Sequence, residues 1–263
     1  MDDVKKRVKH ILGWVIFRLG LHRWLFRNRG TVVLFHRVDD RHPGNPISST
    51  AEEFSAYCQF FKRHFPVIAI GDLISRLEED RDVGGTVCIT FDDGYRDNRT
   101  VAAPELRRLG LPACFFTVSG IIGSSTVPWW DEELGIVSEW MTWDELRDLT
   151  AMGFDVGAHT VNHVDLGIIG GEEARREISE SRARLEKELG IPVPWFSYPY
   201  GRRNQMTEEN REIVRELGFR CCLSGYGGDV RRGTDPFRIR RMPISPWYLS
   251  PYHFGWEMIF GNR

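Results

Sequence analysis

Short apolar runs recur along most of the chain, and each ends in a polar residue or a turn. From Thr31 onward they alternate with stretches in which apolar residues recur every three or four positions, the spacing of an amphipathic helix. The strands predicted from these runs are Thr31–Phe35, Val87–Phe91, Ala113–Val118, Phe154–Ala158, Trp195–Tyr198, Cys221–Leu223 and Phe237–Met242. Such alternation favours parallel βα units. We therefore predict an α/β fold over residues 31–263, a single distorted (β/α) barrel of about seven parallel strands.

Residues that start and stop helices stand between these runs. Thr50 with Glu53, and Thr142 with Glu145, have the spacing of capping boxes. Glycines stand where the helices should end, at Gly110, Gly153, Gly190 and Gly218.

The first 30 residues form a separate segment with a different pattern. Apolar side chains recur at helical spacing from Val4 to Leu19, and lysines at positions 5, 6 and 9 lie on another side of the same helix. Such a basic amphipathic helix could lie on an anionic membrane surface through residues 1–28. It could equally pack against the barrel, because helices of soluble proteins show the same stripe. Both interpretations stay open at this stage.

Composition and charge narrow the function classes. The 263 residues carry 35 Lys and Arg against 37 Asp and Glu, a formal charge of −2 that offers no field for nucleic acid, so we expect no nucleic-acid partner. The five cysteines make a poor disulfide framework. No apolar run approaches the ~20 residues that span a bilayer. We expect a cytoplasmic protein, with peripheral contact at the inner membrane face as the alternative that the basic helix offers.

Two motifs that follow predicted strands carry the candidate chemistry. The adjacent carboxylates Asp92 and Asp93 end the run Val87–Phe91, and such a pair repels unless a cation or a raised pKa relieves it. His159 and His163 directly follow Phe154–Ala158. One carboxylate and two imidazoles make the ligand set of a catalytic metal with an open position. Either motif alone is weak, but together they predict a divalent metal site.

A third motif, Trp195–Gly201, is an aromatic strand that opens into a Pro and Gly turn. Such a turn can aim a backbone N–H at a bound oxygen, and a groove with aromatic rings suits the faces of sugars. An ordinary core strand followed by a turn would show the same pattern. The tryptophans that we expect to line the groove are Trp129, Trp130, Trp143 and Trp195.

In combination, these motifs resemble the polysaccharide deacetylases, also called the NodB homology domain or carbohydrate esterase family 4. The resemblance covers roughly Thr31–Ile244. Thr90–Gly94 resembles the first family motif, His159–His163 the second, and Phe196–Gly201 a variant of the third. Val33–Val38 is similar to the opening of members linked to exopolysaccharide synthesis.

The resemblance implies a metal-dependent hydrolase that removes N-acetyl groups from an amino-sugar polysaccharide or its precursor. It makes Asp92 the general base and the Tyr200 backbone N–H part of an oxyanion hole. It makes Asp93, His159 and His163 the ligands of a divalent metal, usually Zn²⁺. The physical chemistry of the residues agrees, because a metal-polarised carbonyl, a carboxylate base and an amide donor together promote acyl transfer to water.

The chain departs from the commoner family pattern at two positions. Ser197 stands where many members have an arginine that orients the base, and Arg241 is similar to a late-strand arginine of a variant subgroup that could replace it. The late motif that supplies the general acid is not recognisable. His36 and His253 are the candidates, and His36 is better placed because it follows a predicted strand. A buried structural histidine is an equally good interpretation of His36.

Two other function classes stay open. One is hydrolysis of another non-peptide C–N bond, in a small N-acyl or ureide substrate, which the tryptophan-rich groove disfavours. The other is a non-catalytic glycan-binding protein, which the intact set of aspartates and histidines disfavours.

Overall fold

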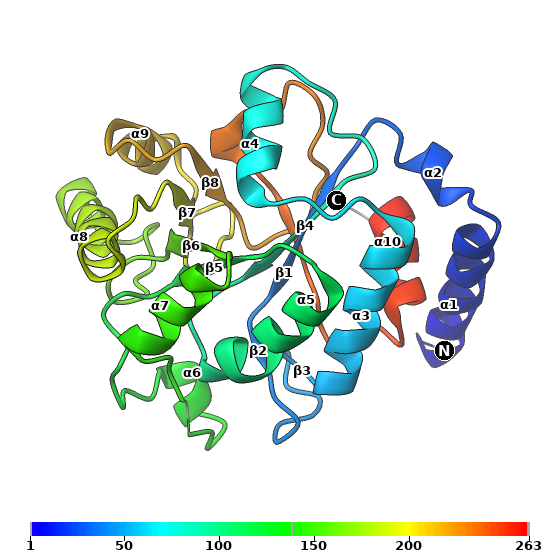
Figure 1. The fold of residues 1–263 in the computed structure, drawn as a ribbon, viewed down its shortest axis with the longest axis horizontal. Coiled ribbons are helices and arrows are strands. Elements are labelled where there is room, and N and C mark those ends of the chain that lie inside the picture. The colour runs from blue at the N-terminus through cyan, green and yellow to red at the C-terminus, as the bar shows by residue number, and fades with distance from the viewer. Residues whose placement is uncertain (1, 138, 262–263) are drawn as a thin grey trace.

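The strands form one nearly closed parallel barrel (Figure 1). The computed structural model describes residues 2–137 and 139–261, and within them seven strands pair in the order β8-β7-β6-β5-β4-β1-β9, each neighbouring pair parallel. A parallel bridge between Leu223 and Ile239 links β8 to the segment before β9. This confirms the predicted fold class. The strands are β1 (Thr31–Phe35), β4 (Val87–Phe91), β5 (Cys114–Thr117), β6 (Asp155–Ala158), β7 (Trp195–Ser197), β8 (Cys221–Leu223) and β9 (Arg241–Pro243).

Helices cover the outside of the barrel and one of its ends. The predicted capping boxes both form, at Thr50 with Glu53 and at Thr142 with Glu145. Gly110 and Gly190 end their helices in the left-handed conformation. The helices around the barrel are α3 (Ala51–His64), α4 (Ile70–Glu78), the π-helix η1 (Asn98–Ala102), α5 (Ala103–Leu109), α6 (Trp129–Glu132), α7 (Trp143–Ala151), α8 (Gly171–Leu189), α9 (Glu208–Glu216) and α10 (Pro251–Phe260).

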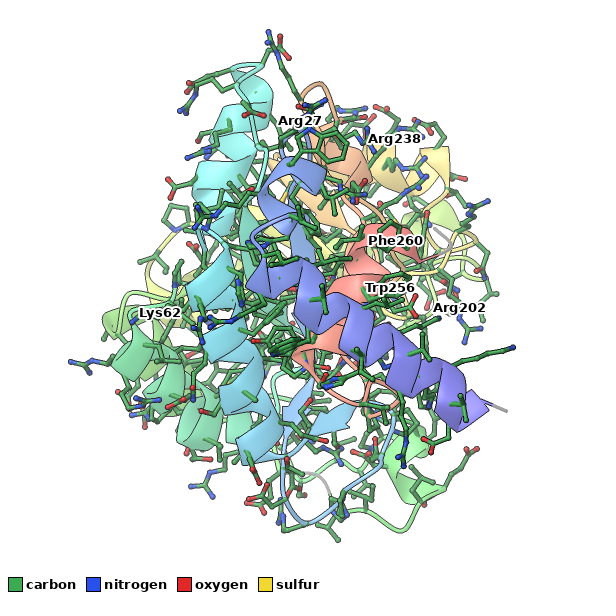
Figure 2. The ribbon with its side chains drawn as sticks, turned by 90° about the vertical axis from the view of Figure 1, so that its right-hand side faces the viewer. Arg27, Lys62, Arg202, Arg238, Trp256 and Phe260 are labelled. Carbon is green, nitrogen blue, oxygen red and sulfur yellow. The ribbon has the colours of Figure 1, made fainter. Side chains whose placement is uncertain are left out.

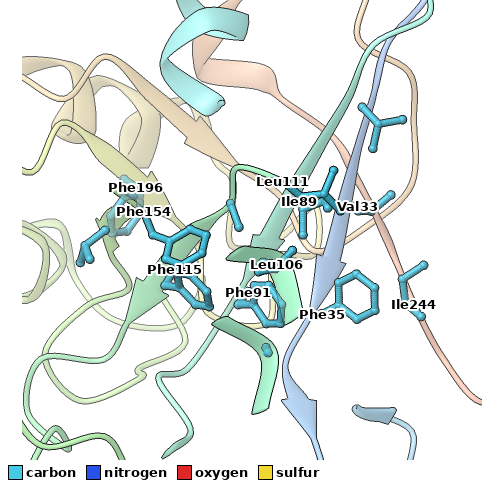
Figure 3. Packing of buried hydrophobic residues seen from close by; sticks show 14 of the residues in the cluster. Val33, Phe35, Ile89, Phe91, Leu106, Leu111, Phe115, Phe154, Phe196 and Ile244 are labelled. Carbon is cyan, nitrogen blue, oxygen red and sulfur yellow. The ribbon is translucent and has the colours of Figure 1, made fainter. Parts of the chain in front are cut away.

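Alternate residues of each strand face opposite sides, as a period of two requires. Phe35, Phe91 and Phe115 are partners across β1, β4 and β5 and point toward the outer helices, with successive ring centroids 5.4 and 4.7 Å apart (Figure 3). The intervening residues, such as Val32 and Cys88, pack inside the barrel with the apolar face of α4. Inner positions near the carboxyl ends of the strands are therefore available for polar side chains.

One predicted strand is wrong over much of its length. In place of a strand over Phe237–Met242, the chain forms a 3₁₀ turn at η2 (Pro236–Arg238) before β9. The side chain of Asp235 accepts a hydrogen bond from the Phe237 N–H and so starts that turn. A further short pair, β2 (Arg37–Val38) with β3 (Ser48–Ser49), was not predicted.

The N-terminal segment forms two helices on the flank of the barrel, α1 (Asp2–Arg18) and α2 (His22–Leu25). The predicted helix is thus confirmed, and α1 lies beside α10 (Figure 1). Among residues 2–137 and 139–261, no helix is both long enough and apolar enough to cross a membrane.

Candidate metal-dependent active site

The parallel strands bring the motif residues to one edge of the barrel. His36 follows β1, Asp92 and Asp93 follow β4, and His159 follows β6. All four line one cavity of about 350 Å³. Ligand sites of parallel α/β folds lie at this carboxyl edge because the strand ends and their loops converge there.

Asp93, His159 and His163 form a compact cluster of ligand atoms. One atom from each lies within 4.8 Å of the others. The Nε2 atoms of His159 and His163 are 3.5 and 3.4 Å from Asp93 Oδ1. Asp93 and His163 are held in the left-handed backbone region, with φ of 76° and 54°. Such strained residues gather at functional sites.

The orientation of the imidazoles fits a metal. His159 Nδ1 donates a hydrogen bond to the Ser197 carbonyl over 2.8 Å, which leaves the Nε2 lone pair directed toward the cluster. A second partner of this kind is typical of metal-binding histidines. The His163 ring lies between the rings of Trp130 and Tyr200, with centroids 4.6 and 4.9 Å away. Two imidazoles and one carboxylate suit a divalent cation with an open coordination position.

The neighbouring carboxylate, Asp92, is held by an arginine from the far end of the chain. Arg241 Nη1 and Nη2 donate to the two Asp92 oxygens over 2.8 and 2.6 Å, a bidentate pair. Ser197 Oγ donates to Asp92 and accepts from Arg241. Both charged side chains are almost fully buried. Arg241 therefore forms a bidentate ion pair with Asp92, and Ser197 Oγ bridges the two groups.

The charges of the site lower the pKa values of both aspartates. Burial opposes the ionisation of Asp92, but the charge of Arg241 outweighs it and holds the Asp92 pKa below its usual value. For Asp93 the contacts with His159 and His163 also outweigh burial, and its pKa lies well below the usual value. Both carboxylates are therefore ionised at neutral pH. Together they make the site strongly attractive to a cation.

Of the two histidines considered as a general acid, only His36 lines the cavity. Burial lowers its pKa despite the nearby charges of Asp93 and Asp92. His253 lies on α10, where its Nδ1 accepts from the Leu249 N–H and its Nε2 is 3.6 Å from Glu257.

Tyr200 also lines the cavity, in a left-handed conformation with φ of 60°. Within the part of the chain that the structure describes, its backbone N–H has no acceptor. The turn is tight, because a Cβ on Gly201 would meet the Gly225 nitrogen at 2.0 Å. This geometry leaves the Tyr200 N–H available to a bound oxygen.

The structure also reveals a polar network that the sequence did not indicate. Trp130 Nε1 donates to the Tyr95 hydroxyl, which donates to Asp131. Asp131 is fully buried and pairs with Arg37 over 2.5 Å. The network holds the Trp130 ring against His163. No local pattern pairs Arg37 with Asp131, because the two lie 94 positions apart in the sequence.

Two of the four tryptophans that were expected to line the groove do so. Trp129 and Trp130 line the cavity, and Trp129 Nε1 donates to the Tyr200 hydroxyl over 3.3 Å. Trp195 instead packs inside the barrel with α4, and Trp143 packs against the outer core. Trp195 faces inward near the start of β7, and Trp143 lies on a covering helix, so neither reaches the site.

Sequence comparison agrees with this architecture. The profile of the family described as polysaccharide deacetylase matches residues 80–222, which is more than half of the chain and includes Asp92, Asp93, His159 and His163. The chain therefore belongs to the polysaccharide deacetylase family.

Individual relatives are distant but match over most of their length. The poly-beta-1,6-N-acetyl-D-glucosamine N-deacetylase of Staphylococcus epidermidis is 22% identical over 239 residues, covering 83% of this chain and 80% of its own. The deacetylase PplD of Streptococcus pyogenes, solved with acetate, superposes with a TM-score of 0.74 at 20% identity, covering 88% of this chain and 98% of its own. IcaB from Ammonifex degensii gives a TM-score of 0.71 at 22% identity, covering 88% and 97%. At these identities the solved structures establish a shared fold.

Proposed function

We propose that this protein is a metal-dependent hydrolase that removes N-acetyl groups from an amino-sugar glycan or its precursor. The observation that carries the proposal is the position of Asp92. It is a buried, ionised carboxylate held beside the cluster of Asp93, His159 and His163, at the base of an aromatic-walled cavity. The family membership and the name of the staphylococcal relative support the acetylated amino sugar as the substrate class.

In this proposal Asp93, His159 and His163 hold a divalent cation, and Zn²⁺ suits the two imidazoles best. When bound, the cation supplies Lewis-acid polarisation of an acyl carbonyl and makes water more acidic. Asp92 accepts the proton from the attacking water. Each carboxylate oxygen has two acceptor sites, so the bonds from Arg241 and Ser197 leave room for that proton.

The remaining residues act on the substrate. The Tyr200 N–H stabilises the negative oxygen that develops when the carbonyl becomes tetrahedral. The leaving amine takes up the proton that Asp92 accepted from the water, and His36, a neutral imidazole in the cavity wall, passes that proton on. Trp129 and Trp130 present apolar ring faces to the sugar. The products are acetate and a free amino sugar.

The test is release of acetate from N-acetylglucosamine oligomers of different linkage by metal-loaded protein, with Asp92→Asn as the matched control. Acetate release by the parent protein and not by the variant supports the proposal. Turnover of small N-acyl or ureide compounds with no turnover of oligomers assigns another C–N hydrolase. Oligomer binding without release of acetate assigns a glycan-binding protein.

A further inference from the structure

Helix α1 packs on the barrel through its less apolar side. Gly13 lies against α10 so closely that a Cβ there would meet the Tyr252 carbonyl oxygen at 2.1 Å. One turn further on, Phe17 is buried, with its ring centroid 4.7 Å from that of Phe60. Lys9 pairs with Glu257 of α10 over 2.5 Å. This face therefore anchors the helix.

The opposite face of α1 is apolar and exposed. Residues spaced by three, four or seven positions lie on one side of a helix, and the exposed members of this stripe are Val4, Val8, Ile11, Leu12 and Leu19. Ile11 keeps 57% and Leu19 67% of its surface accessible. Figure 2 views this flank directly, and no other described element lies over α1. The apolar stripe that the sequence shows is thus the part that the barrel does not cover.

Basic side chains border the stripe on both sides. Lys5 lies along one edge, and Arg7 and Arg18 lie along the other. A further cation stands just beyond α2, where Arg27 stacks over the exposed ring of Trp24 with its guanidinium carbon 5.1 Å from the ring centroid. Residues 1–30 hold eight Lys and Arg and two Asp, whereas the rest of the chain is acidic. Of these eight, Lys9 pairs with Glu257 and Arg29 with Asp229 on the barrel side, so the cations that border the stripe are Lys5, Arg7, Arg18 and Arg27.

From this arrangement we infer that the α1–α2 face docks on the surface of an anionic lipid bilayer, with α1 parallel to the membrane plane. An apolar stripe with cationic edges matches an interface of acyl chains and negative headgroups. A second copy of this chain is a poorer occupant, because a symmetric contact would place the basic edges of one copy against those of the other.

The docked orientation keeps the catalytic cavity free. None of the residues that line the cavity belongs to α1 or α2. Docking through this face therefore leaves the residues that line the cavity uncovered. The inference stands on α1 and α2 alone and does not depend on the reaction proposed above.

The experiment is co-sedimentation of the full chain with vesicles of phosphatidylcholine alone or with one quarter phosphatidylglycerol, at low and high salt. The variant Val8→Asp/Ile11→Asp places charge in the stripe, and Ile168→Asp, at a site 79% exposed on a distant loop, is the matched control. Lys5→Gln/Arg18→Gln removes two edge charges, with Arg107→Gln/Arg176→Gln as its control. All substituted side chains are exposed, and melting temperatures report whether each variant folds.

We expect binding to the anionic vesicles at low salt, little binding to the neutral ones, and release at high salt. The stripe variant should bind more than about tenfold more weakly, and the edge variant about 25-fold more weakly, while both controls bind like the parent. The inference is overturned if folded parent protein stays in the supernatant with anionic vesicles at low salt. It is also overturned if the stripe substitutions abolish a dimer seen by analytical ultracentrifugation and leave vesicle binding unchanged.

Discussion

Arg241→Met removes the guanidinium that faces Asp92 and leaves that carboxylate buried without its counter-charge. Both side chains are nearly inaccessible, at 0% and 4% of their surface, and two short hydrogen bonds join them. Breaking a buried ion pair from one side costs about 3–5 kcal/mol, because the remaining charge has neither partner nor water. We expect the free energy of unfolding to fall by that amount in urea denaturation.

The double-mutant cycle with Asp92→Asn separates this pairing from general damage to the core. If the cost comes from an uncompensated charge, Arg241→Met should be less costly when residue 92 is a neutral amide. The coupling free energy should be about 1–3 kcal/mol. Additive effects of the two substitutions, within about 0.5 kcal/mol, would refute the reasoning.

Kinetics test the positioning role of Arg241 independently of stability. A misplaced base lowers kcat by about 10²-fold, so Arg241→Met should lower kcat more than it raises KM. Arg241→Lys keeps the charge, so its free energy of unfolding should lie closer to that of the parent than its kcat does. One ammonium group cannot reproduce the two parallel hydrogen bonds that position the carboxylate. In the Asp92→Asn background, Arg241→Met should lower kcat no further. A further large loss of kcat there would show that Arg241 acts on something other than Asp92.

Three more predictions concern the metal ligands, the two aspartates and pH. Treatment with a chelator should remove both the metal and the activity, and so should His159→Ala or His163→Ala. Metal analysis of dialysed protein checks this, and full metal occupancy in the double variant His159→Ala/His163→Ala contradicts it. Asp92→Asn should keep the metal and lower kcat by about 10²-fold or more, whereas Asp93→Asn should release the metal. Equal metal loss in both variants would contradict the assignment of Asp92 as the base and Asp93 as the metal ligand. Burial raises the pKa of Asp97 from 3.8 to about 6, so between these values the folded state binds more protons than the unfolded chain and stability falls as pH rises. In urea denaturation Asp97→Asn should be more stable than the parent above pH 6, by up to about 3 kcal/mol. The difference should vanish below about pH 3, and a pH-independent difference contradicts this.

Local patterns predicted the elements and the metal cluster. The strands Thr31–Phe35, Val87–Phe91 and Cys221–Leu223 form with the predicted bounds, because buried parallel strands are short, continuous apolar runs. Asp93 and His159 each directly follow a strand, and parallel strands bring their carboxyl ends to one edge. The convergence of the cluster therefore followed from the order of motifs along the chain. The roles of its members, the substrate and the compartment stay predictions.

Other features depend on contacts that no local pattern encodes. Arg241 is 149 positions from Asp92, and Asp131 is 94 from Arg37. Such pairs form only because the nearly closed barrel brings β9 beside β1 and places α6 at the cavity. Trp143 and Trp195 were predicted to line the groove but pack in the core. The sequence could not separate the two positions, because aromatic residues suit a core as well as a groove.

The N-terminal helix has one property that a local pattern predicted and one that depends on tertiary contacts. The spacing of apolar residues was enough to predict an amphipathic helix in this segment, because it reports the helical period directly, and α1 forms over Asp2–Arg18. Which face packs on the barrel depends on contacts with α10. Gly13 allows α1 to approach the backbone of α10, and Lys9 finds Glu257 there, so the less apolar face is anchored and the apolar stripe remains exposed. Periodicity reveals that a helix has two faces, but the shape and charge of the partner surface determine which of them is buried.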